Sequence, residues 1–171
     1  PKLADFEAAR EVVGRVAQET PMESSRILSQ ILGSEVLLKC ENLQRTGSYK
    51  LRGAYNLIAS LSPAERKKGV VAASAGNHAQ GVALAAHEMG IKATIFMPVG
   101  VALPKLEATQ GYGADVVLEG NIFNESLKAA QEFAKKTGAV FIPPFDDPHV
   151  IAGQGTLGLE ILEDVPDVDT I

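Results

Sequence analysis

The sequence has very little cysteine, no excess of positive charge and no long apolar run. Cys40 is the only cysteine among 171 residues, so no disulfide can form within the chain, which favours a reducing compartment such as the cytoplasm. The formal net charge is -5, which argues against nucleic acid and anionic membranes as partners, because both attract basic surfaces. No apolar run approaches the roughly 18 residues that a membrane-spanning helix needs.

Several motifs of catalysis and metal binding are also missing. The sequence contains no G-x-x-x-x-G-K-[ST] phosphate loop and no G-x-S-x-G nucleophile turn. His78, His87 and His149 lack the spacing of metal ligands, and the pair His87-Glu88 is not followed by a second histidine one turn later. We therefore expect no metal site.

The residues that are present predict an α/β fold. Hydrophobic residues make up 46% of the sequence, enough for a sizeable core. Short apolar runs of strand length alternate with segments in which apolar residues recur at helical spacing, which predicts an open, twisted parallel sheet with helices on both faces. The expected strands lie in the runs EVLLKC, GVVAAS, KATIFM, ADVVLEG and GAVFIP. The expected helices cover about 5–17, 48–60, 77–88, 103–110, 122–136 and 151–163.

The loop SAGNHAQG, residues 74–81, is the first candidate site. It follows an expected strand and opens an expected helix, which is where parallel α/β sheets bind ligands. Backbone amides at a helix start attract anions, and Ser74 and Asn77 add polar side chains. Ordinary helix capping is the alternative, since serine and asparagine are common at that position. The density of Ser, Gly, Asn and His within this loop favours a binding site over capping alone.

Lys50 is the second candidate. It follows Gly47, Ser48 and Tyr49 and lies in the first turn of the helix expected from Ser48. The positive end of the helix dipole disfavours a cation, and this promotes the neutral amine that adds to carbonyl groups. A solvated surface lysine is the alternative, because that is the usual state of this residue type.

Two other stretches resemble sites but are better explained by structure. The glycines of GQGTLG, residues 153–158, match G-x-G-x-x-G, yet they follow DDPHVIA, which has the pattern of a helix start and not of a strand. We expect these glycines to allow close helix packing. Asp146 and Asp147 are expected to form a turn and a helix cap, and not a catalytic pair.

Four segments together resemble one enzyme family. They are ENLQRTGSYKLRGAYN, SAGNHAQGVALAA, KLEATQGYGADVVL and PPFDDPHVIAGQGTLGLEIL, in the order typical of threonine dehydratases. These are fold type II pyridoxal-phosphate enzymes, related to serine racemase and to the β chain of tryptophan synthase. The resemblance extends from Thr20 to Ile171 and is specific, because all four motifs are in register.

The resemblance implies roles for individual residues. In the motif S-[FY]-K-x-R-G-A, the lysine holds pyridoxal phosphate covalently, and it matches Lys50. Tyr49 matches the aromatic residue beside the cofactor ring, and Asn77 the asparagine that hydrogen-bonds the phenolic oxygen. The loop that binds the substrate carboxylate matches Ser74, Ala75, Gly76, Asn77 and His78. The implied reaction converts L-threonine to 2-oxobutyrate and ammonia, or L-serine to pyruvate and ammonia, with Lys50 as the base.

Alternatives within and outside the family stay open. Racemases that this chain resembles have a second serine, the base on the opposite face, where this sequence has Ala75. We therefore expect poor racemisation and favour a dehydratase, closer to the short catabolic enzymes than to the biosynthetic ones. The alternatives that remain are a sibling enzyme with the same cofactor, such as a serine racemase or a serine dehydratase, and a truncated, non-catalytic α/β module that binds a small anion or a partner chain.

The resemblance also implies a domain organisation. Residues 1–39 would begin a large domain, residues 40–141 would form a small domain, and residues 142–171 would return to the large domain. The family's glycine-rich phosphate loop is expected beyond Ile171, so we expect a fragment that is inactive alone and holds the cofactor weakly. The family further implies a homodimer or homotetramer at full length.

Overall fold

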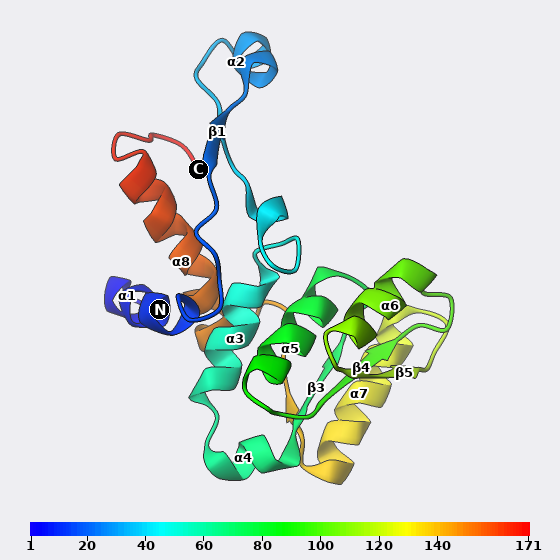
Figure 1. The fold of residues 1–171 in the computed structure, drawn as a ribbon. Helices are drawn as coiled ribbons and strands as arrows, with labels where there is room; N and C mark the ends of the chain where they lie inside the picture. Colours follow the sequence, from blue (N-terminus) through cyan, green and yellow to red (C-terminus); the bar gives the residue numbers. More distant parts are fainter.

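The fold is α/β, with eight α-helices, six short strands and one 3-10 helix (Figure 1). The structure is a computed structural model that describes residues 1–171. The helices are α1 (Leu3–Val13), α2 (Arg26–Leu32), α3 (Lys50–Ser60), α4 (Pro63–Lys68), α5 (Asn77–Glu88), α6 (Leu103–Gly111), α7 (Phe123–Thr137) and α8 (Pro148–Asp164). The remaining elements are the strands β1 (Met22–Ser24), β2 (Leu37–Lys39), β3 (Val70–Ala73), β4 (Ala93–Met97), β5 (Asp115–Leu118) and β6 (Val140–Phe141), and the 3-10 helix η1 (Glu41–Leu43).

The main sheet has four parallel strands in the order β5-β4-β3-β6, with helices on both faces, as predicted. Successive residues of a strand point to opposite faces of the sheet. Val70 and Ala72 of β3 accordingly join the core under α3 and α5, whereas Val71 and Ala73 join a second core under α7. The strand β3, whose four residues are all buried, therefore contributes to both cores.

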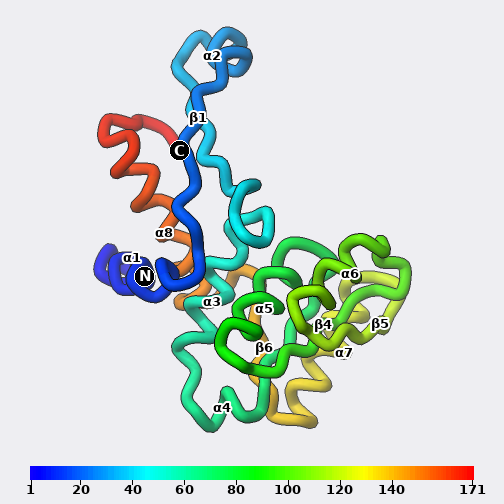
Figure 2. The backbone as a smooth tube through the Cα atoms, viewed as in Figure 1, coloured from blue at the N-terminus to red at the C-terminus, as the bar shows by residue number.

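One predicted strand lies elsewhere. The run EVLLKC is expected in the buried parallel sheet, but β2 pairs antiparallel with β1 in a separate two-stranded sheet. None of the three residues of β2 is fully buried. Beyond these two strands, α2 projects away from the rest of the chain in Figure 1 and in Figure 2. The expectation is wrong because an apolar run does not reveal which strand it pairs with.

The contact between α3 and α8 confirms the expected packing role for Gly153, but not for Gly158, where an added Cβ would meet no atom within 4 Å. A Cβ atom on Gly153 would lie 2.6 Å from the carbonyl oxygen of Arg52 and 2.7 Å from the Cα of Gly53, so only glycine permits this approach. Asp147 caps α8, as expected, by accepting hydrogen bonds from the amides of His149 and Val150. No helix of the structure combines the length and apolar character needed to cross a bilayer.

Candidate functional site

Lys50 is the first residue of α3, two residues later than the predicted helix start. Its Nζ donates a hydrogen bond of 2.8 Å to the carbonyl oxygen of Pro144, which lies between β6 and α8. The same Nζ lies 5.3 Å from the centre of the Tyr49 ring, and Tyr49 is 40% exposed. The amine is thus held by one backbone carbonyl beside an accessible aromatic face.

The predicted loop connects β3 to α5 and presents free backbone amides. Ser74 Oγ accepts from the amide of Gly76 at 3.2 Å, but the amides of Asn77 and His78 have no acceptor in the protein. The side chain of Asn77 is exposed, and a Cβ atom on Gly76 would meet no atom within 4 Å. Unpaired amides at a helix start beside open space form an anion-binding arrangement.

His78 is the buried member of this loop, with 4% of its surface exposed. Its Nε2 lies 3.0 Å from the carbonyl oxygen of Ile142, and because a carbonyl only accepts, Nε2 carries the hydrogen. Nδ1 is buried and has no partner. Burial, with a smaller contribution from the nearby charge of Lys50, lowers the pKa of His78 to about 4, although the hydrogen bond to Ile142 opposes the shift. The imidazole is therefore neutral at physiological pH.

The fold brings the two candidate sites together at residues 142–144. His78 from α5 binds Ile142, and Lys50 from α3 binds Pro144, two residues further along the same segment. The helices also touch directly, since a Cβ atom on Gly81 would lie 3.0 Å from the carbonyl carbon of Lys50. Each predicted site residue is thus on α3, on α5 or in the turn before one of these helices: Tyr49, Lys50, Ser74, Ala75, Gly76, Asn77 and His78.

The titration of His78 makes stability depend on pH. In the unfolded chain this histidine gains a proton below about pH 6.5, whereas in the folded chain it stays neutral down to about pH 4. Above pH 6.5 the titration of His78 therefore leaves the free energy of unfolding unchanged. This free energy falls as the pH decreases from 6.5 to 4, by about 3 kcal/mol at pH 4.

Urea unfolding of the protein and of His78→Gln, at pH 7 and at pH 4, tests this dependence. Glutamine keeps a donor for Ile142 but does not titrate. We expect the difference in unfolding free energy between the two proteins to change by about 3 kcal/mol between these pH values. An unchanged difference would mean that His78 is not held neutral.

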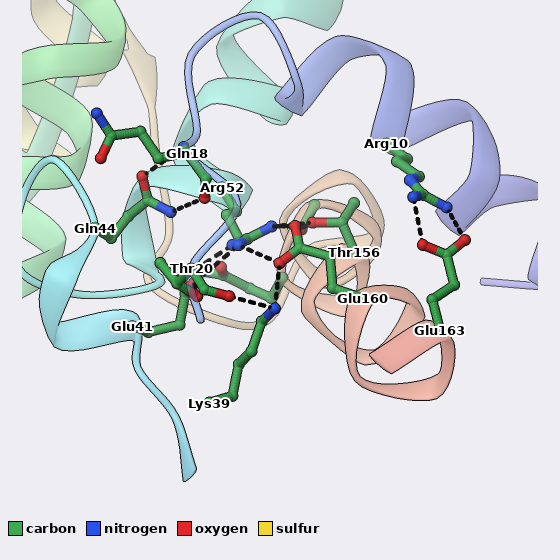
Figure 3. Close-up of polar contacts among 12 residues, drawn as sticks. Arg10, Gln18, Thr20, Lys39, Glu41, Gln44, Arg52, Thr156, Glu160 and Glu163 are labelled. Atoms are coloured by element: carbon green, nitrogen blue, oxygen red, sulfur yellow. Dashed lines mark hydrogen bonds and ion pairs between the residues drawn. The ribbon is translucent and has the colours of Figure 1, made fainter. Parts of the chain in front are cut away.

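Sequence reasoning did not identify the buried ionic network around Arg52 (Figure 3). Arg52, which is 1% exposed, donates to both carboxylate oxygens of Glu41 and of Glu160, at distances from 2.5 to 3.0 Å, and to Thr156 Oγ1 at 3.3 Å. Lys39 Nζ binds Glu160 at 3.1 Å. No local signal links Arg52 to Glu160, because 108 positions separate them in the chain.

The network keeps its members charged although it is buried. Desolvation acts against the charge of Arg52, but the hydrogen bonds to Glu41 and Glu160 raise its pKa above the usual range. Burial alone would raise the pKa of Glu41, yet the hydrogen bonds from Arg52 and Thr20 lower it below the ordinary value. The two cations Arg52 and Lys39 thus balance the two carboxylates in the centre of the cluster.

The arrangement around Lys50 suits an anionic ligand with an aldehyde group. A primary amine can attach to the aldehyde, the Tyr49 ring offers a face, and Asn77 and the free amides of α5 offer donors. The structure groups no three His, Cys, Asp or Glu side chains that could hold a metal ion.

Comparison with known proteins gives a consistent set of relatives. Residues 14–171 match the family described as pyridoxal-phosphate dependent enzyme. The chain is 59% identical to L-threonine ammonia-lyase of Thermotoga maritima, covering 99% of this chain and 42% of that protein. It is 50% identical to the catabolic L-threonine dehydratase TdcB of Escherichia coli K12, covering 97% of this chain and 50% of that protein.

Solved structures also resemble this chain. Threonine deaminase isoform 2 from Solanum lycopersicum, in its processed form, superposes with a TM-score of 0.92 at 48% identity, covering 97% of this chain and 45% of that one. Maize serine racemase superposes with a TM-score of 0.94 at 35% identity, covering 98% and 51%. The chain spans about half the length of the relatives it matches.

Proposed function

Because the chain belongs to the pyridoxal-phosphate dependent enzyme family, we propose that it carries the lysine and the substrate loop of a threonine dehydratase. The proposed reaction converts L-threonine to 2-oxobutyrate and ammonia, and L-serine to pyruvate and ammonia. The contact of Lys50 and His78 with the same three-residue segment is the observation that carries this proposal, because it joins the amine to the anion-binding loop. The identities of 59% and 50% to an L-threonine ammonia-lyase and an L-threonine dehydratase support the choice of substrate.

The residues present fit the cofactor. Lys50 would hold pyridoxal phosphate through its amine, Tyr49 would pack beside the ring, and Asn77 would donate to the phenolic oxygen. Pyridoxal phosphate supplies, when bound, an electron sink that acidifies the Cα–H of the amino acid. The chain's own residues then decide where the substrate lies and where its protons go.

Each side chain has a separate task in the proposed mechanism. The free amides of Asn77 and His78, with Ser74, bind the substrate carboxylate and fix the orientation of its Cα–H bond. Once the substrate amine has replaced it on the cofactor, the free Lys50 amine would take the Cα proton as general base and pass it to the β-hydroxyl, which would leave as water. The enamine product would then hydrolyse to the oxo acid and ammonia. Because His78 is neutral, it places no second positive charge beside the Lys50 amine.

Ala75 is the position that separates this proposal from a racemase. Maize serine racemase superposes closely, so racemisation is the second candidate activity. Racemisation needs a base on each face of the substrate, and alanine at 75 has no hydroxyl to serve as the second. The alanine is partly buried in the loop between Ser74 and Gly76.

Introducing a hydroxyl at this position tests the distinction. In the full-length protein, we expect Ala75→Ser to increase the rate of D-serine formation from L-serine by about 10²-fold, the lower range for one positioned base. Chiral chromatography of the products measures this rate. The control is Ala108→Ser on α6, which adds the same hydroxyl to a helix outside the loop and should leave the rate unchanged. Fast racemisation by the unchanged protein would favour the racemase instead.

We extend the proposal to organisation and location. The small domain would span residues 40–141, between two parts of a large domain at 1–39 and 142–171. The protein would act in the cytoplasm as a homodimer or homotetramer, without nucleic acid or membrane partners. The single cysteine and the net charge of -5 support the location and the choice of partners. Light scattering of the full-length protein tests the assembly, and a monomeric mass would contradict it.

A further inference from the structure

Arg52 uses every hydrogen-bond donor that its guanidinium has. Nε donates to Glu41, one terminal nitrogen to Glu41 and Glu160, and the other to Glu160 and Thr156. The two carboxylates are therefore bound in parallel pairs along two edges of one plane. Glu41 belongs to η1, whereas Thr156 and Glu160 belong to α8. One side chain thus ties α3 to two other elements (Figure 3).

The position of Arg52 in α3 relates these contacts to Lys50. Each residue of an α-helix is rotated about 100° around the axis from the one before it. Side chains two positions apart therefore point to nearly opposite sides of the helix. Arg52 points into the network, and Lys50 points to Pro144 on the other side. Any rotation of α3 that moved the guanidinium would therefore move the amine as well.

Other contacts of α3 with α8 and α5 also restrict its movement. Gly53 donates its amide to Gln154 at 3.1 Å, and Asn56 donates to the carbonyl of His149 at 2.8 Å. The backbone of Lys50 also touches α5 at Gly81. Because α3 is packed this closely, its rotation about its own axis stays fixed as long as its polar contacts with α8 persist.

We infer that Arg52 is a positioning residue that sets the place of the Lys50 amine by fixing the rotation of α3 between η1 and α8. The inference rests on the proposed role of Lys50. Arg52 itself does not touch the amine and acts through the helix that both residues share. Lys39 completes the arrangement, since its bond to Glu160 orients the carboxylate that α8 offers to Arg52.

Lysine cannot replace arginine in this role. An ammonium has three donors around one atom, whereas the guanidinium presents five in a planar fork. Arg52→Lys therefore keeps the charge but cannot bind both carboxylates in parallel pairs. A displacement of about 1 Å at a catalytic group can lower a rate by 10²-fold, so a small rotation of α3 is sufficient to be measured.

The test uses the full-length protein and two independent measurements. The first is the rate at which borohydride reduction fixes pyridoxal phosphate on Lys50, read by peptide mass spectrometry. The second is the separation of kcat from KM for L-threonine. The control is Phe133→Ala on α7, which removes a ring 5.5 Å from Phe96 in the core on the other face of the sheet. It lowers stability without touching α3.

For Arg52→Lys we expect fixation on Lys50 to slow by at least ~10-fold and kcat to fall by about 10- to 100-fold, with KM nearly unchanged. Phe133→Ala, measured well below its melting temperature, should keep both values. Fixation and kcat at unaltered levels in Arg52→Lys, with only a lower melting temperature, would overturn the inference. If Arg52→Lys does not fold, Glu160→Gln decides by the same two criteria, because it removes one charged acceptor and leaves the arginine.

This design separates the inference from the proposed function. If the unchanged protein is not modified on Lys50, the proposed function fails and the inference with it. If fixation on Lys50 and kcat are both equal in the unchanged protein and in Arg52→Lys, only the inference fails.

Discussion

In the full-length protein, replacing Lys50 with alanine is expected to lower the rate of 2-oxobutyrate formation from L-threonine by about 10⁴-fold. The amine has two tasks in the proposed mechanism, holding the cofactor and moving the Cα proton, and alanine can perform neither. Stability should change little, because the side chain is only partly buried and makes one hydrogen bond, to Pro144. A coupled assay for the oxo acid measures the rate, and thermal melting measures the fold.

The matched control for this substitution is Lys128→Ala. Lys128 lies on α7 and its side chain is 79% exposed, so its removal tests the loss of a lysine without loss of the site. We expect full activity. If Lys50→Ala retained more than about a tenth of the activity while remaining folded, the amine of Lys50 would not be the base.

Gly153→Ala is expected to destabilise the protein by about 1–3 kcal/mol, the range for overpacking a tight core. The added Cβ would meet the backbone of α3 at 2.6 and 2.7 Å, and backbone atoms cannot rotate away as a flexible side chain would. α3 must then separate from α8 or shift along it. Because Lys50 begins α3, we also expect activity to fall more than the loss of stability alone would explain.

Gly158→Ala is the matched control for this prediction, in the same helix and further along it. A Cβ atom on Gly158 would meet no atom within 4 Å. Alanine is the better helix former, so this variant should be more stable than the original by up to about 1 kcal/mol. Urea unfolding of the three proteins measures both effects. Equal stability of the two variants would contradict the close contact between α3 and α8.

Features that depend on nearby residues could be predicted from the sequence. The helix Asn77–Glu88 is predicted with its observed ends, because its start follows a glycine and its apolar spacing is regular. The parallel sheet and the two layers of helices follow from the alternation of elements. The helix α4 is not among the expected helices although a signal is present, since Ser62 and Glu65 form the capping box that begins it.

Features that depend on distant residues could not be predicted in this way. The prediction that β2 belongs to the parallel sheet is wrong, because its pairing with β1 is decided by the tertiary fold and not by the composition of the strand. The ionic network of Arg52 with Glu160 could not be predicted either, because 108 positions separate the two residues in the chain. The candidate site could be predicted in part. Lys50 and the loop at 74–78 were both identified from local pattern and resemblance, but their meeting at residues 142–144 required the structure.

Mapping the lysine that borohydride fixes to pyridoxal phosphate tests the central claim most directly. The full-length protein would be incubated with the cofactor, reduced, digested and examined by peptide mass spectrometry. We predict modification on Lys50 alone among the lysines of this chain, because only this amine lies between an accessible aromatic face and the segment that His78 binds. Modification spread over the surface lysines, with Lys50 no more reactive than Lys128, would contradict the account.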